Sequence, residues 1–180
     1  MDMEKYPELQ DYLNYMSVER GMAKNSVLAY GRDLRRFFAY VEKKKADLAG
    51  VDSQFAQDHL VDIQNGGVSA RSAVRALSAI KAFIGYLVST GRLATDKVSE
   101  AQSPRLRKRI PGFLDLKDIL KMIESVSTAT PAGMRDRAIL ELLYGAGLRV
   151  SELCDLTLSQ IDLTNGFITV IGKANKERTI

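Results

Sequence analysis

The segment 91–112 constrains the fold more than any other stretch, because no continuous helix or strand can run through it. A glycine opens it, a Pro-Gly pair closes it, and a second proline lies between them. Proline lacks a backbone N–H and disfavours a helical conformation in the residue before it. Four of the five residues in 105–109 are basic. The sequence therefore predicts two domains, residues 1–90 and 113–180, joined by a basic linker.

The basic residues of this linker have two interpretations. Positive side chains between two domains can follow a phosphate backbone when the domains enclose a duplex, and they can equally be ordinary solvated charges. The residues that would contact DNA under the first interpretation are Arg105, Arg107, Lys108 and Arg109.

The composition excludes several classes of protein. The 180 residues are 46% hydrophobic and 27% charged, as in ordinary globular proteins, and no run of 18 apolar residues predicts a membrane span. The N-terminus lacks the apolar core of a secretory signal, and the single cysteine, Cys154, is compatible with a reducing cytoplasm. One histidine and one cysteine far apart give no metal-site spacing. The net charge of +4 is compatible with nucleic acid without requiring it.

The first domain shows the 3.6-residue periodicity of amphipathic helices, interrupted by glycines and capping residues. The pattern predicts four helices with short connections, over residues 6–19, 26–44, 52–65 and 69–90, and hence an all-α domain. His59, the only histidine, is interpreted as an ordinary surface or packing residue. The expected core residues are Leu9, Tyr12, Leu13, Met16, Tyr30, Leu34, Phe37, Val41, Phe55, Leu60, Ile63, Val74, Leu77, Ile84 and Leu87.

Two helices of this domain carry arginines away from their apolar faces. Arg32, Arg35 and Arg36 lie on the second helix, and Arg71 and Arg75 lie on the fourth beside small residues. Such basic faces can approach a DNA duplex closely, and they can also be solvated surfaces or pack against neighbouring helices. The sequence alone leaves both interpretations open.

The second domain opens with helical patterns over residues 115–125 and 134–144. The second of these stops at Gly145-Ala146-Gly147, after which a new helix begins near Arg149. The residues expected to be buried around this turn are Tyr144, Val150, Leu153 and Cys154, the last three because their spacing forms one stripe of the new helix.

A hairpin is predicted near the end of the chain. Residues 167–171 are β-branched and aromatic, which predicts a strand, and a returning strand begins at Glu177 after a turn. Lys173 would lie at the tip of this hairpin. A lysine in such a place is either solvated or a proton donor directed into a cleft.

Arg149 is the first candidate site residue. It lies at the start of its helix, and Glu152 follows one turn later, where a carboxylate can orient the guanidinium group. A guanidinium held in this way suits phosphate recognition better than a mobile lysine does. The alternative is a structural Arg–Glu pair that caps a packed helix.

Several stretches resemble a known family of enzymes. Residues 21–37, GMAKNSVLAYGRDLRRF, resemble the N-terminal, core-binding domain of Xer-type tyrosine recombinases. Residues 135–153 and 171–178, which contain Gly147-Leu148-Arg149 and Ile171-Gly172-Lys173, resemble the start of their catalytic domain. The resemblance implies a mainly α fold, in which a four-helix, SAM-like core-binding domain precedes the truncated start of an α+β catalytic domain.

The resemblance also implies site-specific DNA recombination. Such enzymes cut one DNA strand with a tyrosine through a 3′-phosphotyrosyl intermediate, and a 5′-hydroxyl of the partner strand reseals it. Arg149 would bind the scissile phosphate, Glu152 would support Arg149, and Lys173 would protonate the leaving 5′-oxygen. No metal, nucleotide or other cofactor is implied, because the covalent intermediate conserves the phosphodiester bond energy. The implied partners are double-stranded DNA and further recombinase subunits, either self or a paralogue.

The later motifs of the family have no counterpart before Ile180, where the sequence stops. These are a His-x-x-Arg pair, a further His or Trp, and the nucleophilic tyrosine. We therefore expect this chain to bind DNA without cleaving it, and to be monomeric or weakly associated alone. It is the front of a Xer-type recombinase, or a short non-catalytic relative that occupies recombination sites or modulates a full-length enzyme, or a helical structural protein. The sequence specifies neither the target site nor the role, chromosome dimer resolution or mobile-element integration.

Overall fold

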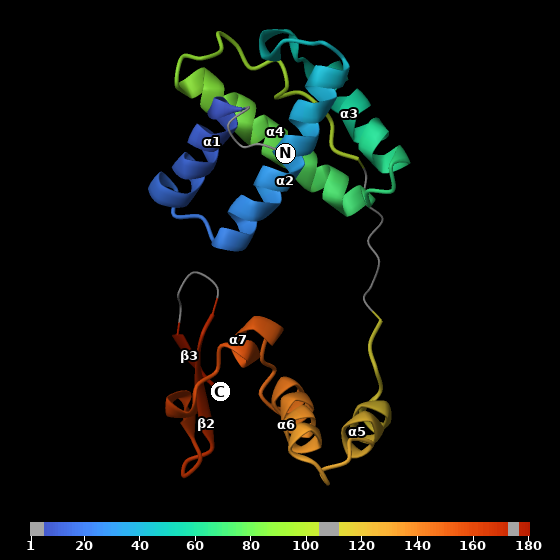
Figure 1. Ribbon diagram of the computed structural model, residues 1–180, viewed down its shortest axis with the longest axis vertical. Helices are drawn as coiled ribbons and strands as arrows, with labels where there is room; N and C mark the ends of the chain where they lie inside the picture. The colour runs from blue at the N-terminus through green and yellow to red at the C-terminus, as the bar shows by residue number, and fades with distance from the viewer. Residues whose placement is uncertain (1–5, 105–111, 173–176) are drawn as a thin grey trace. The chain divides into compact units, whose positions relative to one another are not determined.

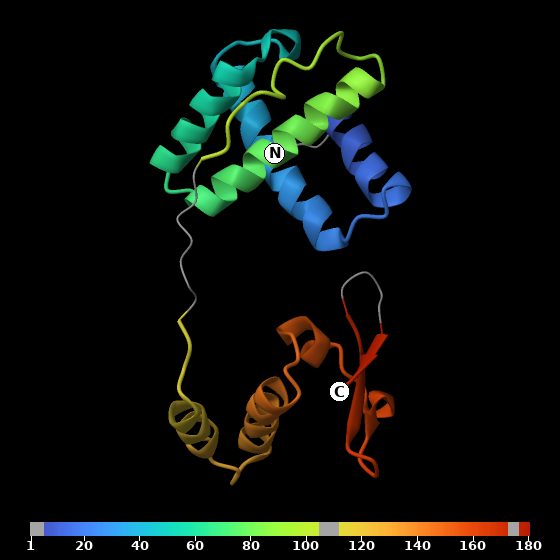
Figure 2. The same cartoon turned by 180° about the vertical axis from the view of Figure 1, so that it is seen from behind.

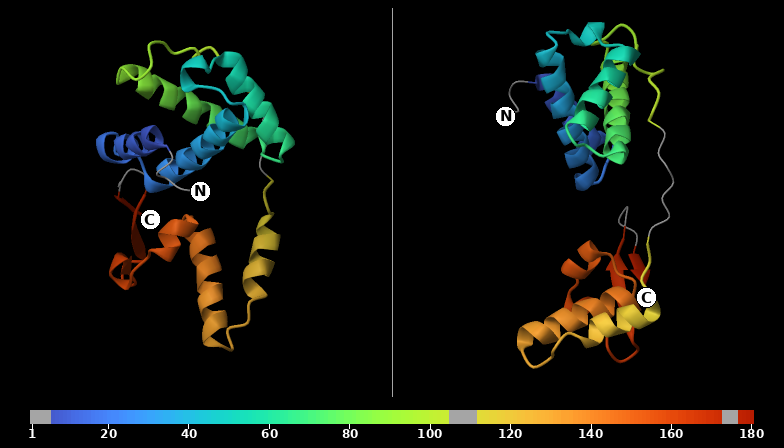
Figure 3. Two further views of the ribbon diagram at one scale, coloured as in Figure 1. Left: turned by 45° about the horizontal axis from the view of Figure 1, so that its top comes forward. Right: turned by 90° about the vertical axis from the view of Figure 1, so that its right-hand side faces the viewer.

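The computed structural model describes residues 6–104, 112–172 and 177–180 (Figure 1). The chain forms two compact units, Met1–Lys108 and Arg109–Ile180. Figures 2 and 3 show the elements of both units from behind and from two further sides.

In its described residues, the first unit is a bundle of four helices with short connections. Its elements are α1 (Pro7–Asn14), η2 (Tyr15–Glu19), α2 (Lys24–Lys43), η3 (Leu48–Gly50), α3 (Ser53–Asn65) and α4 (Ala70–Ser89). The π-helical turn η2 continues α1 directly. Asp52 and Ser69 cap α3 and α4, because each side chain accepts a hydrogen bond from a backbone N–H three residues later. The all-α prediction for this part of the chain is confirmed.

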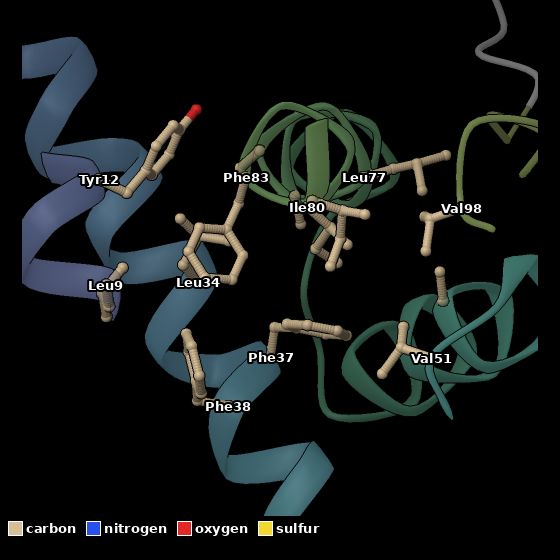
Figure 4. Packing of buried hydrophobic residues seen from close by; sticks show 14 of the residues in the cluster. Leu9, Tyr12, Leu34, Phe37, Phe38, Val51, Leu77, Ile80, Phe83 and Val98 are labelled. Carbon is tan, nitrogen blue, oxygen red and sulfur yellow. The ribbon is translucent and has the colours of Figure 1, made fainter. Parts of the chain in front are cut away.

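The core of the first unit lies where α4 packs on α2 and α3. Leu34 and Phe37 of α2 lie with Ile80 and Phe83 of α4 in one buried cluster (Figure 4). From α1, Tyr12 adds an edge-to-face contact with Phe83, at 5.4 Å between ring centroids. Burial of these large apolar side chains is the main source of stability for the unit.

Helix α4 combines length with high hydropathy. Among the described parts of the chain, it is the one helix long and apolar enough to cross a membrane, by length and composition only. Its buried residues, including Leu77, Ile80 and Phe83, face the core of the first unit. This core position accounts for its hydropathy.

The chain that follows α4 stays on the helices as far as Ala101. Val98 and Ala101 are both buried in the core of the first unit. Asp96 shapes the turn, because its Oδ1 accepts hydrogen bonds from the backbone N–H groups of Val98 (2.8 Å) and Ser99 (2.9 Å). The first part of the expected linker, residues 91–112, is therefore packed on the helices, since Val98 contributes an apolar side chain to their core.

Over residues 112–172 and 177–180, the second unit combines three helices with a small antiparallel sheet. Its elements are α5 (Leu116–Glu124), α6 (Pro131–Gly145), α7 (Val150–Cys154), η4 (Leu158–Gln160), β1 (Ile161–Asp162), β2 (Phe167–Ile171) and β3 (Glu177–Thr179). The strand order is β1-β2-β3, and Val170 of β2 lies opposite Arg178 of β3. A mainly α chain with a small β component agrees with the predicted fold class.

Few apolar side chains are buried in the second unit. Among its described residues, these are Ile123, Leu148 and Val170. The large apolar side chains that it exposes are Phe113, Leu114, Leu116, Leu120, Met122, Met134, Tyr144, Val150, Leu158, Leu163, Phe167, Ile171 and Ile180. The apolar pattern of the sequence is therefore only partly used in packing here.

The turn between α6 and α7 packs differently from the expectation. Tyr144 and Val150, expected in the core, are 49% and 68% exposed, and Cys154 is exposed as well. The side chains that point inward are those of Leu148 and Glu152. Of the expected stripe, Leu153 is half-buried, whereas the prediction is wrong for Val150 and Cys154. Helix α7 is only five residues long, and its inward position is occupied by a hydrogen-bonded carboxylate.

Candidate active site

A tight turn between α6 and α7 presents Arg149. Gly147 has a positive φ of 56°, a backbone conformation that favours glycine. Leu148 is buried and anchors the turn in the small core. Arg149 follows as the N-cap residue of α7, with extended backbone angles (φ −74°, ψ 150°). The turn therefore fixes the backbone of Arg149 at the start of the helix.

Glu152 is held by both the backbone and the side chain of Arg149. Its Oε2 accepts a hydrogen bond from the backbone N–H of Arg149 at 2.8 Å, and its Oε1 accepts one from Nη1 at 2.6 Å. The side chain of Glu152 is 4% exposed, whereas that of Arg149 is 60% exposed. The carboxylate thus anchors one edge of the guanidinium from inside. Among the described residues no other group accepts from this guanidinium, so its remaining donors can reach an anion outside.

Arg178 is a third member of this cluster, and sequence reasoning misses it. From β3, its Nη2 donates to Glu152 Oε2 at 2.8 Å and to Gly147 O at 3.4 Å. Residues opposite each other in an antiparallel pair project from the same face of a sheet. Its partner Val170 is buried, so the hairpin register could have predicted an inward Arg178. The contact with Glu152 could not be predicted, because it joins segments 26 residues apart.

The surroundings of Glu152 keep its carboxyl group ionised. The backbone N–H of Arg149 makes the largest contribution to lowering its pKa, and the guanidinium groups of Arg149 and Arg178 lower the pKa further, whereas burial raises it. The result is a pKa of about 2, compared with an ordinary value of 4.5. Two guanidinium groups and one carboxylate give the cluster a net positive charge. The arrangement can therefore bind an anion such as a phosphate group through Arg149.

The arginines predicted to contact DNA lie on α2 and α4 of the first unit. Arg32, Arg36 and Arg71 are exposed, and Arg35 is half-buried. Their exposure makes them accessible to a nucleic acid, and their contact with DNA stays a prediction. The other predicted site residues, Lys173, Arg105, Arg107, Lys108 and Arg109, lie outside the described residues.

Arg75, the fifth of these arginines, is tied to the protein itself. Its Nε and Nη2 donate to the two carboxylate oxygens of Asp33, at 2.8 and 3.3 Å. The side chain of Asp33 is 2% exposed, so this pair joins α2 to α4 from within. The hydrogen bond to Asp33 raises the pKa of Arg75. Sequence reasoning misses Asp33, since a carboxylate between apolar positions gives no signal for a partner on another helix.

The histidine and the acidic residues form no metal site in the parts of the chain that the structure describes. No group of three or more His, Cys, Asp or Glu side chains is close enough there to hold an ion. His59 is buried against the rings of Phe37 and Tyr40, at centroid distances of 5.5 and 5.0 Å. Of the two interpretations of His59, the structure selects the packing residue.

Comparison with known proteins identifies both units. Residues 9–91 match the phage integrase N-terminal SAM-like domain, and residues 112–180 match the phage integrase family. Tyrosine recombinase XerD of Listeria monocytogenes is 36% identical over 174 residues, which are 96% of this chain and 59% of that relative. Tyrosine recombinase XerD of Pseudomonas aeruginosa is 36% identical over 180 residues, covering 100% of this chain and 60% of the relative. The chain thus spans less than two thirds of the length of these relatives.

Two solved structures share the fold. A lambda integrase dimer bound to a COC' core site matches with a TM-score of 0.77 and 19% identity, over 100% of this chain and 62% of that one. The XerH site-specific recombinase bound to its difH substrate matches with a TM-score of 0.66 and 19% identity, over 96% and 51%. At this identity the likeness establishes the fold.

The fold and both sequence matches make this chain a member of the phage-integrase family, whose enzymes are tyrosine recombinases. Within the family, it corresponds to the N-terminal part of a Xer-type recombinase, with XerD proteins among its relatives. The resemblance seen in the sequence is confirmed.

Proposed function

We propose that this chain is the DNA-binding and phosphate-recognition part of a site-specific recombinase. The observation that carries the proposal is the guanidinium of Arg149, which is anchored on the buried Glu152 and exposed on its outer side. A guanidinium fixed in this way matches the oxygens of a phosphate group, and the net positive charge of the cluster strengthens the attraction. The names of the XerD relatives and the DNA-bound integrase structures support the same function.

In the proposed reaction, a tyrosine of the complete recombinase attacks the scissile phosphate and displaces the 5′-oxygen. Arg149 binds the phosphate and stabilises the negative charge that develops in the transition state. Glu152 keeps Arg149 in place, and Lys173, between β2 and β3 in the sequence, protonates the leaving 5′-oxygen. A 5′-hydroxyl then attacks the 3′-phosphotyrosyl bond and releases the tyrosine. No metal or nucleotide is required, because the covalent bond to tyrosine conserves the energy of the phosphodiester.

The first unit and the basic segment after it supply the contacts to the DNA backbone. The proposed contact residues are Arg32, Arg35, Arg36, Arg71, Arg75, Arg105, Arg107, Lys108 and Arg109. Their charges would displace counterions from phosphates, so the affinity for a duplex should fall steeply with salt. Further recombinase subunits, self or paralogue, would occupy the same DNA, as the dimeric and tetrameric lambda integrase complexes support.

By itself, the 180-residue polypeptide is proposed to bind duplex DNA without cleaving it, and to be monomeric or weakly associated without DNA. The absence of cleavage is supported by its single histidine, His59, which is buried among the helices of the first unit and lies far along the chain from Arg149. The alternative is a short relative that occupies recombination sites, or modulates a full-length enzyme, without chemistry of its own. The buried histidine agrees with this alternative as well as with the front part of a recombinase. The exposed free cysteine fits a reducing cytoplasm.

The test is the affinity of the chain for a mixed-sequence duplex, measured by fluorescence anisotropy at low and high salt. We expect Arg149→Gln to weaken binding about fivefold to tenfold, the effect of one lost charge-assisted contact of about 1 kcal/mol or slightly more. Arg137→Gln is the matched control, because Arg137 lies on α6 and is paired with Glu141 at 2.9 Å on the surface. It removes the same charge and should change the affinity much less.

Two results would contradict the proposal. Equal loss of affinity in both variants would show that Arg149 acts only through its charge. An affinity that does not change with salt would show that phosphates are not contacted. A phosphotyrosyl adduct trapped on a nicked duplex would overturn the absence of cleavage alone.

A further inference from the structure

We propose that Arg178 is a positioning residue of this site, which holds the Glu152 carboxylate from β3 and thereby fixes the orientation of Arg149. The consequence for phosphate rests on the proposed function, whereas the effect on Arg149 itself does not. Neither the sequence motif nor the expected chemistry assigns a role to Arg178.

The two carboxylate oxygens of Glu152 accept hydrogen bonds from different groups. Oε1 accepts the hydrogen bond that orients the guanidinium of Arg149, at 2.6 Å. Oε2 accepts from the backbone N–H of Arg149 and from Nη2 of Arg178, both at 2.8 Å. Rotation of the carboxylate is therefore opposed at Oε2, which keeps Oε1 directed at the Arg149 side chain. Without Arg178, one of the two contacts that prevent this rotation is lost.

Arg178 also connects two segments that both contribute a residue to the proposed reaction. Its Nη2 reaches the carbonyl oxygen of Gly147 at 3.4 Å, in the turn that carries Arg149. Its backbone lies in β3, opposite Val170 of β2, so it belongs to the hairpin whose connecting segment contains Lys173. One side chain thus joins β3 to the turn that carries Arg149, and β3 cannot shift relative to this turn without breaking its contacts.

A purely stabilising ion pair would behave differently. The side chain of Arg178 is 40% exposed, so its attraction to Glu152 is partly screened by water and its loss should change the stability little. A positioning role instead predicts a change at Arg149, a residue to which Arg178 makes no direct hydrogen bond among the described residues. The motion of the Arg149 guanidinium separates the two roles.

The experiment compares the 180-residue chain with its Arg178→Gln and Arg178→Lys variants by side-chain ¹⁵N NMR. The rate of rotation about the Nε–Cζ bond of Arg149 is measured first, and inorganic phosphate is then titrated while the Arg149 Nε–Hε signal is followed. In Arg178→Gln we expect rotation to be about fivefold faster and the phosphate Kd about threefold higher, since a less ordered guanidinium loses more conformational freedom when it binds the anion. Arg178→Lys keeps the charge as a single point and should give intermediate values.

Arg137→Gln again serves as the control, because it removes an arginine of the same unit that does not contact Glu152. In this variant the rotation rate of Arg149 and the phosphate Kd should match those of the unchanged chain. A pH titration of the Glu152 carboxyl carbon adds a second readout. In Arg178→Gln its pKa should rise from about 2 towards 4.5, because one of the groups that lower it is removed.

Unchanged Arg149 rotation in a folded Arg178→Gln chain would overturn the positioning role, whatever the phosphate affinity. If Arg178→Gln does not fold, rotation in Arg178→Lys decides, and a rate equal to that of the unchanged chain overturns the proposal. If phosphate fails to shift the Arg149 signal in the unchanged chain, the proposed phosphate site fails. The rotation comparison then still decides the role of Arg178.

Discussion

His59 makes the stability of the first unit depend on pH. It is buried, and neither of its ring nitrogens has a hydrogen-bond partner among the described residues. Burial lowers its pKa from 6.5 to about 4, against the opposing charges of Asp62 and Asp33 and with a small contribution from Arg36. The unfolded chain therefore binds the proton more tightly than the folded chain does. The contribution of neutral His59 to the free energy of unfolding should be complete above pH 6.5. It should be lost as the pH drops towards 4, by up to about 3 kcal/mol.

The measurement is the free energy of unfolding in urea, followed by circular dichroism at pH values between 4 and 7. His59→Leu is the comparison, because leucine is close in size and cannot be protonated. Carboxylates that titrate in the same window act equally on both proteins. The difference between the two curves should therefore grow as the pH falls, and parallel curves would refute the assignment to His59.

Single residues also show where sequence reasoning stops. The Arg149–Glu152 pair could be predicted, because the two residues are one helical turn apart and their contact is local. The contacts of Asp33 with Arg75 and of Glu152 with Arg178 could not, because they span 42 and 26 residues. Periodicity assigns a residue to a face but does not name its partner across the fold. The polar network of the site is thus the part that required the structure.

At the level of elements, local patterns predicted the helices of the first unit and the strand β2 well. Apolar residues at helical spacing, and caps such as Asp52, act within a few residues. The pattern fails after α4, where Val98 lies in an irregular segment with no periodicity to indicate its burial. It also fails at α7, since a helix of five residues is too short for an apolar stripe to determine its orientation.

The packing of Val98 can be tested directly. It is fully buried, and truncation to alanine removes two methyl groups from the core of the first unit. We expect Val98→Ala to lower the free energy of unfolding of this unit by about 2 kcal/mol. Val18→Ala is the control, because Val18 is 80% exposed and its truncation should have an effect below about 0.5 kcal/mol. Equal effects of both substitutions on urea unfolding would show that residues after α4 do not belong to this core.

Across the whole molecule, the two units differ strongly in how much apolar surface they bury. Among the described residues, the first unit has an extended core of helix side chains, whereas the second buries only Ile123, Leu148 and Val170. Both units have regular hydrogen-bonded helices, so backbone bonding does not separate them. Because burial of apolar surface dominates folding stability, the second unit should be the less stable of the two.

Hydrogen exchange followed by mass spectrometry measures this difference in the intact chain. We expect amides in α5 and α6 to exchange at least about tenfold faster than those in α2 and α4, after correction for intrinsic rates, because tenfold corresponds to about 1.4 kcal/mol of local stability. Val98→Ala supplies an internal control, since it should accelerate exchange in α2 and α4 and leave α5 and α6 unchanged. Protection of α5 and α6 equal to that of α4 would mean that the exposed apolar side chains of the second unit are covered in solution, and the burial argument would then be wrong.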